Sequence, residues 1–464
     1  MELKSQDELS HAAAGLASGR GDALDRLVWT GVFGSAGLRE AARGAVLEQA
    51  RSSGLYPASI HGLYAARGRG ETPTTFTVPA INIRGATYDT ARALFRARRR
   101  LDAGAVLIEI ARSEISYTDQ RPAEYVFVLL AAALREGWTG PVFVQGDHFQ
   151  INAKKYAADP AGELQAVKTL TAEAIEAGFY NIDVDTSTLV DLSKSGHEAQ
   201  QAQNGGLCAE LTAFIRQHEP RGVTVSVGGE IGEVGGKNST AEELTAFMKV
   251  YGEALGRAAP GAPGISKISI QTGTSHGGVP LPDGRIAQVS IDFDAIEKLS
   301  KLARERYRMA GAVQHGASTL PAELFDRFPR LGACEIHLAT EFQNMLFDHS
   351  AFPAELKRAI YERLRTAAAD ERKPSDTDEQ FYYKTRKKAL GMFKRDLWGL
   401  PAAVREAIGK SLEDKFAFLI ERLGVTGTRA LAERHAPFVP GSYPTAKAAA
   451  TPVRAHEDVT GLSD

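Results

Sequence analysis

Short apolar runs alternate with amphipathic stretches through the middle of the chain. The apolar runs hold six to eight residues each, and the stretches between them repeat apolar residues at helical spacing, as in TYDTARALFRARRRLDAG at 87–104. This alternation predicts repeated strand–helix units and a parallel sheet. The eight predicted strands cover residues 76–82, 105–111, 141–148, 180–185, 223–230, 265–272, 311–316 and 334–339.

Eight such units over roughly 270 residues predict an α/β protein with a closed (β/α)₈ barrel of the TIM type. The alternative is a doubly wound open sheet, but no glycine-rich dinucleotide fingerprint follows the first strand, which favours the barrel. Helical spacing on either side predicts an N-terminal helical extension at 1–72, a barrel catalytic domain at 73–350 and a C-terminal helical appendage at 351–430. Residues 431–464 lack periodicity and are expected to form a flexible tail.

Composition limits the partners and the cellular location that can be expected. The formal net charge is -2, with 43% hydrophobic and 24% charged residues, so neither a nucleic acid nor an anionic membrane is an expected partner. No apolar run of about 18 residues predicts a membrane span, and the N-terminus lacks the apolar core of a signal peptide. The two cysteines, Cys208 and Cys334, are far apart and form no disulfide framework, which favours a reduced, cytoplasmic location.

Polar side chains stand at the ends of several predicted strands, where barrels of this kind carry their functional groups. They are Asp147 and His148 at the end of the third strand, Asp185 at the end of the fourth, Glu230 at the end of the fifth, His276 after the sixth and His315 at the end of the seventh. Three imidazoles and a carboxylate from four strands are a suitable ligand set for Zn²⁺ with one position left open. Each residue also has an ordinary interpretation, since a histidine can cap a strand, an Asp–His pair can form a turn and a glutamate can cap a helix.

Glycine-rich segments follow the same strands. HGAS at 315–318 and the turn after the eighth strand lie where barrels often bind a phosphate through backbone N–H groups. GGEIGEVGG at 228–236 and SHGG at 275–278 are suited to mobile loops that close over a substrate. The alternative is flexible connections without a ligand.

Five motifs together resemble one known family. GDH at 146–148, DTS at 185–187, GGEIGEVGG at 228–236, GTSHG at 273–277 and HGAS at 315–318 occur in the order seen in the class II fructose-bisphosphate aldolases. These are the zinc-dependent ketose-bisphosphate aldolases, and the resemblance covers about residues 75–345. It implies one catalytic Zn²⁺, for which other divalent ions could substitute, and a sugar-phosphate substrate.

The resemblance also assigns roles residue by residue. His148, His276 and His315 match the zinc-binding histidines, Glu230 and Asp185 match carboxylates that hold the metal in alternative positions, and Asp147 matches the acid that moves the proton in the aldol step. The residues expected to bind substrate or phosphate are Asn82, Gly277, Gly316, Ser318, His337 and Thr340.

The chain departs from the family in three places. The Asn and Asp of the family's eighth-strand motif are replaced by His337 and Ala339. The loop after His276 has no lysine, although Arg285 is a candidate substitute, and Glu233 is the nearest candidate for a mobile-loop glutamate. These departures bear on the substrate more than on the metal.

The predicted function is reversible aldol cleavage of a phosphorylated ketose resembling fructose 1,6-bisphosphate, through a zinc-stabilised enediolate, in cytoplasmic carbohydrate metabolism such as glycolysis. A homodimer or homotetramer is expected. One alternative is a non-catalytic or regulatory subunit of a tagatose-bisphosphate-type aldolase complex, suggested by His337, Ala339 and the helical appendage. Another is a Schiff-base aldolase using Lys267, which is disfavoured because this lysine lies near the start of its strand.

Overall fold

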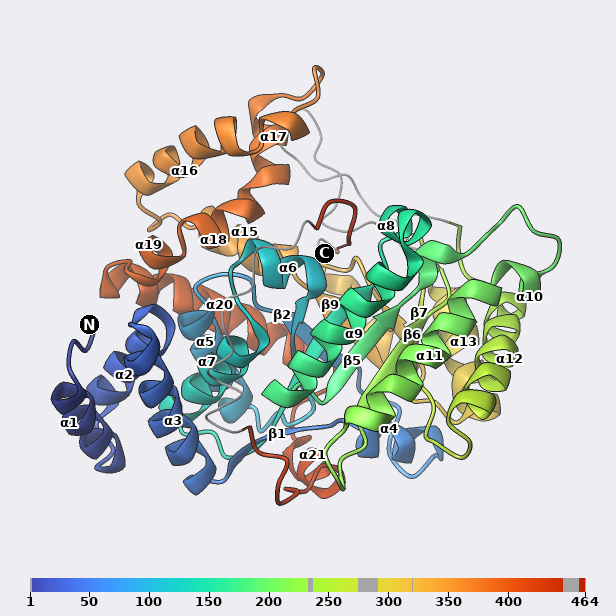
Figure 1. The fold of residues 1–464 in the computed structure, drawn as a ribbon, viewed down its shortest axis with the longest axis horizontal. Helices are drawn as coiled ribbons and strands as arrows, with labels where there is room; N and C mark the ends of the chain where they lie inside the picture. The colour runs from blue at the N-terminus through green and yellow to red at the C-terminus, as the bar shows by residue number, and fades with distance from the viewer. Residues whose placement is uncertain (1, 233–236, 274–290, 319, 445–458, 464) are drawn as a thin grey trace.

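The computed structural model describes residues 2–232, 237–273, 291–318, 320–444 and 459–463. Eight parallel strands close into a barrel in the order β4-β3-β2-β9-β8-β7-β6-β5, and β5 pairs back with β4. Helices surround these strands (Figure 1). This closure confirms the predicted (β/α)₈ barrel and excludes the open sheet. The barrel strands are β2 (Val78–Asn82), β3 (Leu107–Ala111), β4 (Gly140–Gln150), β5 (Asn181–Asp185), β6 (Ser226–Glu230), β7 (Lys267–Ile270), β8 (Ala312–Gln314) and β9 (Glu335–Leu338).

Seven of the predicted apolar runs each contain one observed strand, and the run at 141–148 lies within β4. Barrel strands are covered on both faces, and their sequences are therefore almost continuously apolar. The helices that surround the barrel are α5 (Thr87–Arg100), α6 (Arg112–Tyr117), α7 (Pro122–Arg135), α8 (Ala153–Ala158), α9 (Pro160–Ala177), α10 (His197–Gln200), α11 (Ala202–His218), α12 (Ala241–Ala258), α13 (Phe293–Tyr307), α14 (Arg327–Arg330) and α15 (Thr340–Phe347). No helix in the described part of the chain is long and apolar enough to cross a membrane.

The N-terminal extension is helical except for one short strand. The helix α1 (Gln6–Ala17) packs on α2 (Gly21–Phe33) and α3 (Ala36–Ser52), and these two pack beside α7. The helix α4 (His61–Gly68) follows the strand. The strand β1 (Leu55–Ala58) pairs in parallel with the first residues of β4, from Gly140 to Phe143. This strand was not predicted, because a run of four residues that contains Pro57 gives no strand signal and Pro is tolerated mainly on edge strands.

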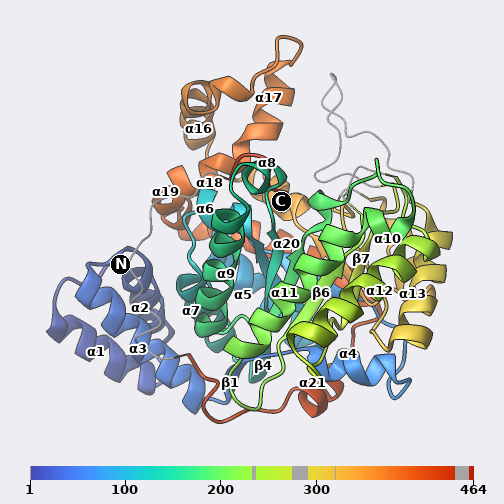
Figure 2. The same cartoon turned by 45° about the vertical axis from the view of Figure 1, so that its right-hand side comes forward.

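The C-terminal region divides in two. The helices α16 (Ala354–Ala367) and α17 (Asp378–Thr385) project from the barrel, and α18 (Ala389–Met392) and α19 (Lys394–Trp398) lead back to it (Figure 2). The next helix, α20 (Ala402–Arg422), packs along α5 in the wall of the barrel. The last helix, α21 (Arg429–His435), crosses the expected start of the tail at residue 431. Residues 445–458 and 464 of the expected flexible tail lie outside the described residues, and the four-domain division remains a prediction.

Candidate metal centre

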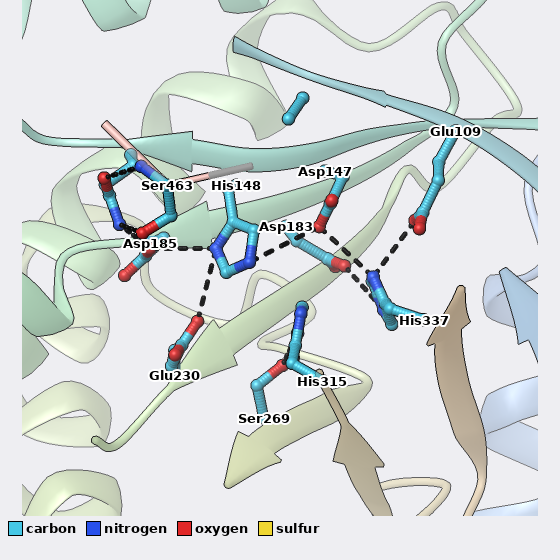
Figure 3. Close-up of polar contacts among 12 residues, drawn as sticks. Glu109, Asp147, His148, Asp183, Asp185, Glu230, Ser269, His315, His337 and Ser463 are labelled. Carbon is cyan, nitrogen blue, oxygen red and sulfur yellow. Dashed lines mark hydrogen bonds and ion pairs between the residues drawn. The ribbon is translucent and has the colours of Figure 1, made fainter. Parts of the chain in front are cut away.

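A bulge in β4 brings two neighbouring side chains into the barrel. The predicted strand ends at His148, but β4 continues to Gln150, and its register with β5 shifts between Gly146 and Phe149. His148 has a φ of 39°, a conformation that non-glycine residues rarely adopt. Successive side chains of a regular strand point to opposite faces, but a bulge re-aims one of them. Both Asp147 and His148 are therefore buried in the same cluster, each 3% exposed (Figure 3).

Asp185 at the end of β5 orients the imidazole of His148. The His148 Nδ1 atom lies 3.0 Å from Asp185 Oδ2, while Asp185 Oδ1 accepts hydrogen bonds from the backbone N–H and the hydroxyl of Ser187 at 3.0 and 2.7 Å. Burial raises the pKa of Asp185, but the hydrogen bonds from His148, Ser187 and Gln150 bring it below its ordinary value. A carboxylate bonded to one ring nitrogen is the usual support of a metal-binding histidine.

Three buried residues from three strand ends form the candidate first metal site, here called site 1. One ligand atom each from His148, Glu230 and His315 lies within 4.8 Å of the other two. The His148 and His315 ring centroids are 4.5 Å apart, and His315 Nε2 lies 3.1 Å from the Ser269 hydroxyl on β7. Two imidazoles and a carboxylate in this arrangement fit a divalent transition-metal ion.

Electrostatics around site 1 also favour a cation. Burial raises the pKa of Glu230 well above its usual range, and the nearby Asp185 raises it further. Burial lowers the pKa of His148, but the carboxylates of Asp147, Asp185 and Glu230 outweigh this effect and raise it well above 6.5. The metal-free cluster therefore holds protons in the positions that a bound cation would take.

His337 on β9 lies next to Asp147. Its Nδ1 atom is 3.1 Å from Glu109 Oε2 and 3.2 Å from Asp147 Oδ1 (Figure 3). Its Nε2 atom is 2.7 Å from Glu335 Oε1. Glu109 and Glu335 were not predicted from the sequence. The only signal was an acidic residue inside an otherwise apolar strand, at Glu109 in AVLIEIA.

Lys267 forms ion pairs inside the barrel. Its Nζ atom lies 2.8 Å from Asp183 Oδ1, 2.5 Å from Glu335 Oε1 and 2.8 Å from Gln145 Oε1. Burial lowers the pKa of Lys267, but Asp183 and Glu335 outweigh burial and raise it above the ordinary value. An amine that remains charged is a poor nucleophile, so this environment argues against the Schiff-base alternative.

Asn82, Gly316, Ser318 and Thr340, which were expected to bind substrate or phosphate, lie at the same end of the barrel. Asn82 Nδ2 donates to Glu114 Oε2 at 2.6 Å. Gly316 has a φ of 68°, which favours glycine, and the Ser318 hydroxyl accepts a hydrogen bond from the backbone N–H of Ala339 at 2.8 Å. Thr340 is the first residue of α15. The loops after β8 and β9 are thus joined, while His276, Gly277, Glu233 and Arg285 lie outside the described residues.

The last described residues of the chain also reach this end of the barrel. Ser463 donates its backbone N–H to Gln150 Oε1 at 2.9 Å and accepts a hydrogen bond from Gln150 Nε2 on its hydroxyl at 3.1 Å. Its carbonyl accepts from the Ser113 hydroxyl at 2.8 Å, and Asn152 Nδ2 donates to the Thr460 carbonyl at 2.8 Å. Gln150 also donates to Asp185, so this segment contacts the support of His148. Nothing in its sequence predicted this.

Similarity to a solved structure with a TM-score above 0.5 supports the fold. A probable tagatose 6 phosphate kinase from Sinorhizobium meliloti 1021 superposes with a TM-score of 0.54 at 19% identity, over 81% of this chain and 97% of that one. The YdjI aldolase from Escherichia coli K12 gives a TM-score of 0.46 at 14% identity, over 81% of this chain and 99% of that one.

Comparison with protein families identifies the chain more closely. Residues 72–396 match the model of fructose-bisphosphate aldolase class-II. The match spans more than half of the chain, includes every strand of the barrel and contains the three residues of site 1. It confirms the resemblance found in the sequence motifs. The protein is therefore a divergent member of the class II fructose-bisphosphate aldolase family.

Proposed function

We propose that this protein is a metal-dependent aldolase that reversibly cleaves a phosphorylated ketose similar to fructose 1,6-bisphosphate. The observation that carries this proposal is the group formed by His148, Glu230 and His315 at the mouth of the barrel, with Asp147 beside it, in a member of this family. Zn²⁺ is the expected ion, with His276 as a further ligand. A homodimer or homotetramer in the cytoplasm remains part of the proposal.

Different residues of the chain perform different parts of the aldol step. A divalent cation, when bound, supplies Lewis-acid polarisation of the ketose carbonyl and stabilises the negative charge that develops on its oxygen. Asp185 fixes the ring of His148, and Ser269 contacts His315, so the ligands are held before substrate arrives. Asp147, 3% exposed and next to His148, accepts the proton of the hydroxyl at the bond that breaks and returns it in the reverse direction.

The glycine and hydroxyl groups after β8 and β9 are proposed to bind the phosphate. The backbone N–H groups near Gly316 and the N-terminus of α15 at Thr340 suit an anion. The hydroxyl of Ser318 uses an oxygen lone pair for Ala339, which leaves its hydrogen available for a phosphate oxygen. Gly277 is proposed for the same role, and Asn82 and His337 for contact with the sugar.

Metal removal and replacement tests the proposal directly. The purified protein is stripped with a chelator, reloaded with Zn²⁺ or another divalent ion, and assayed for cleavage of a panel of ketose mono- and bisphosphates. We expect cleavage to disappear on stripping and to return on reloading, and a Glu230→Gln variant to lose at least about 100-fold in kcat/KM. A His61→Gln variant, which changes a histidine outside the mouth of the barrel, should retain activity. Cleavage that survives exhaustive chelation would refute the metal mechanism.

A second candidate function is that of a non-catalytic partner subunit. It is favoured by His337 and Ala339, which stand where the family has Asn and Asp, and by the projecting helices α16 and α17. The metal-loaded chain assayed alone separates the two functions. Cleavage of any ketose phosphate at a useful rate by the chain alone excludes the partner role.

A further inference from the structure

We propose that Asn204 positions the carboxylate of Glu230 in site 1, because it joins the end of β6 to the end of β5. It does so through a hydrogen-bonded bridge formed by Thr186, Gln201 and Asn204. None of the three is a ligand of site 1, so Asn204 is a positioning residue that acts through the backbone. The proposal rests on metal binding at site 1, which is part of the proposed function.

The two strand ends that carry Asp185 and Glu230 are not paired with each other. The pairing of β5 with β6 ends at Asp183 and Gly228, two residues before the carboxylates. Each end is held on its far side, Asp185 by pairing with β4 and Glu230 by pairing with β7. The hydrogen bonds between β5 and β6 therefore do not fix the distance between the two carboxylate-bearing ends.

Asn204, in the first turn of α11, spans this gap with its side-chain amide. Its Nδ2 atom donates to the Glu230 carbonyl oxygen at 2.8 Å and to Gln201 Oε1 at 2.8 Å. The hydroxyl of Thr186, the residue after Asp185, lies 2.6 Å from Asn204 Oδ1 and 2.9 Å from the Asn204 carbonyl oxygen. One side chain thus contacts the backbone of Glu230 on one strand and the residue that follows Asp185 on the other.

Gln201, directly before α11, adds a second contact to the end of β6. Its Nε2 atom donates to the Ile231 carbonyl oxygen at 3.0 Å. Thr186 and Asn204 are 0% exposed, and Gln201 is 2% exposed. Both N–H groups and the oxygen of the Asn204 amide are used, so its orientation is fixed. A buried network in which these groups are satisfied is rigid, which suits it to hold two strand ends at one separation.

The position of Glu230 matters because its carboxylate and that of Asp185 approach the same imidazole nitrogen. Glu230 Oε2 lies 3.6 Å from His148 Nδ1, and Asp185 Oδ2 lies 3.0 Å from that atom (Figure 3). If β6 moved away from β5, Glu230 would move away from His148. Because a functional site requires its groups within about 0.5 Å of the productive geometry, a small shift would weaken metal binding. Contacts outside the ligand shell commonly control affinity in this way.

Variants that lose one buried hydroxyl test the proposal. Thr186→Val removes the hydroxyl that holds Asn204 at nearly constant volume, and Thr186→Ser keeps a hydroxyl there. Asn204→Ala removes the bridge itself. Thr212→Val is the matched control, because Thr212 is also 0% exposed and lies on α11. Its hydroxyl bonds to the Cys208 carbonyl oxygen at 2.8 Å and to the Tyr251 hydroxyl at 3.2 Å, away from the strand ends.

Metal affinity and metal geometry are the two measurements. Each full-length variant is stripped of metal, titrated with Zn²⁺ by calorimetry, and separately loaded with Co²⁺, whose visible absorption reports the geometry of its ligands. We expect Thr186→Val and Asn204→Ala to bind Zn²⁺ about 10–100-fold more weakly than the wild type and to change the Co²⁺ absorption bands. Thr186→Ser and Thr212→Val should match the wild type in both measurements, even where Thr212→Val lowers the Tm.

The outcomes separate positioning from general stability and from the aldolase assignment. Wild-type affinity and an unchanged Co²⁺ spectrum in both Thr186→Val and Asn204→Ala overturn the proposal, as does an equal loss of affinity in Thr212→Val. No substrate is present in these measurements, so a chain that shows the expected pattern but cleaves no ketose phosphate contradicts only the aldolase assignment. Circular dichroism shows whether each metal-free variant is folded, and if Asn204→Ala does not fold, the comparison of Thr186→Val with Thr186→Ser decides.

Discussion

At the scale of single residues, the backbone at His148 determines which groups meet in the barrel. The sequence predicts Asp147 and His148 at the end of a strand, and this placement at the mouth is correct in outline. It does not show that both side chains enter the same cluster, because a regular strand would separate them onto opposite faces. The left-handed conformation at His148, with φ 39°, and the register shift after Gly146 bring them together. Local sequence carries no signal for that combination.

Gly146 makes this bulge possible. Adding a single methyl group at this position, in a Gly146→Ala variant, tests this role. A Cβ atom at Gly146 would lie 2.5 Å from Cε1 and 2.6 Å from Cζ of Phe149, a side chain that is 0% exposed. Gly146→Ala is therefore expected to displace the Phe149 ring and the bulge, lowering the free energy of unfolding by about 1–3 kcal/mol. Urea denaturation measures this loss, and metal titration should show weaker binding because His148 moves.

Gly252→Ala on α12 is the matched control, since a Cβ at that exposed helical position meets no atom within 4 Å. Replacing a helical glycine by alanine should raise the free energy of unfolding by about 0.5–1 kcal/mol. If Gly146→Ala were as stable as Gly252→Ala and bound metal normally, the close approach of Phe149 would have no role in the site.

At the scale of secondary-structure elements, the elements with strong periodicity were predicted and those defined by tertiary contacts were not. All eight barrel strands follow from apolar runs. By contrast, β1 contains a proline and exists through pairing with β4, and the last residues of β4 continue past the polar Asp147 and His148 because β5 pairs with them. Residues 459–463 take a defined place only through hydrogen bonds to segments some 300 residues earlier, as between Ser463 and Gln150.

The contacts of residues 459–463 predict that this segment strengthens metal binding. Ser463 holds Gln150, Gln150 donates to Asp185, and Asp185 orients His148. Deletion of residues 459–464 should therefore weaken metal affinity by about 10–100-fold, the usual effect of losing an outer support of a metal ligand. Isothermal titration of the stripped protein with Zn²⁺ measures the change.

A Ser442→Ala variant controls for loss of a serine elsewhere in the C-terminal region, because its hydroxyl bonds only locally to the Val439 carbonyl. This variant should bind metal as the wild type does. Unchanged affinity in the deletion variant would show that the segment lies on the barrel without supporting site 1.

At the scale of the whole molecule, barrel closure explains how much of the site could be predicted from the sequence. Once the strands were ordered into a barrel, the ends of β4, β5, β6 and β8 had to converge, so His148, Asp185, Glu230 and His315 could be predicted as neighbours. Glu109 and Glu335 lie within apolar strands, and the sequence does not reveal which face of a strand buried on both sides points inward. The sequence therefore could not predict that these two carboxylates point into the barrel and take part in its buried network of charged groups.

The buried charged groups at the mouth of the barrel predict how metal binding and pH together control the stability of the whole barrel. Bound metal stabilises the folded chain by about 2.7 kcal/mol at a free concentration 100 times Kd, because unfolding separates ligands that lie on different strands. In the metal-free protein the surrounding carboxylates raise the pKa of His148 well above 6.5 although burial opposes this, so the ring is protonated near neutral pH and a cation must displace that proton. Each displaced proton weakens the apparent affinity for the metal about tenfold per unit fall in pH.

Thermal denaturation with and without Zn²⁺ should therefore show a rise in Tm of a few degrees at pH 8 that shrinks at pH 6, and should show almost no rise in Glu230→Gln at either pH. A larger rise at pH 6 than at pH 8 would contradict proton displacement from the metal ligands.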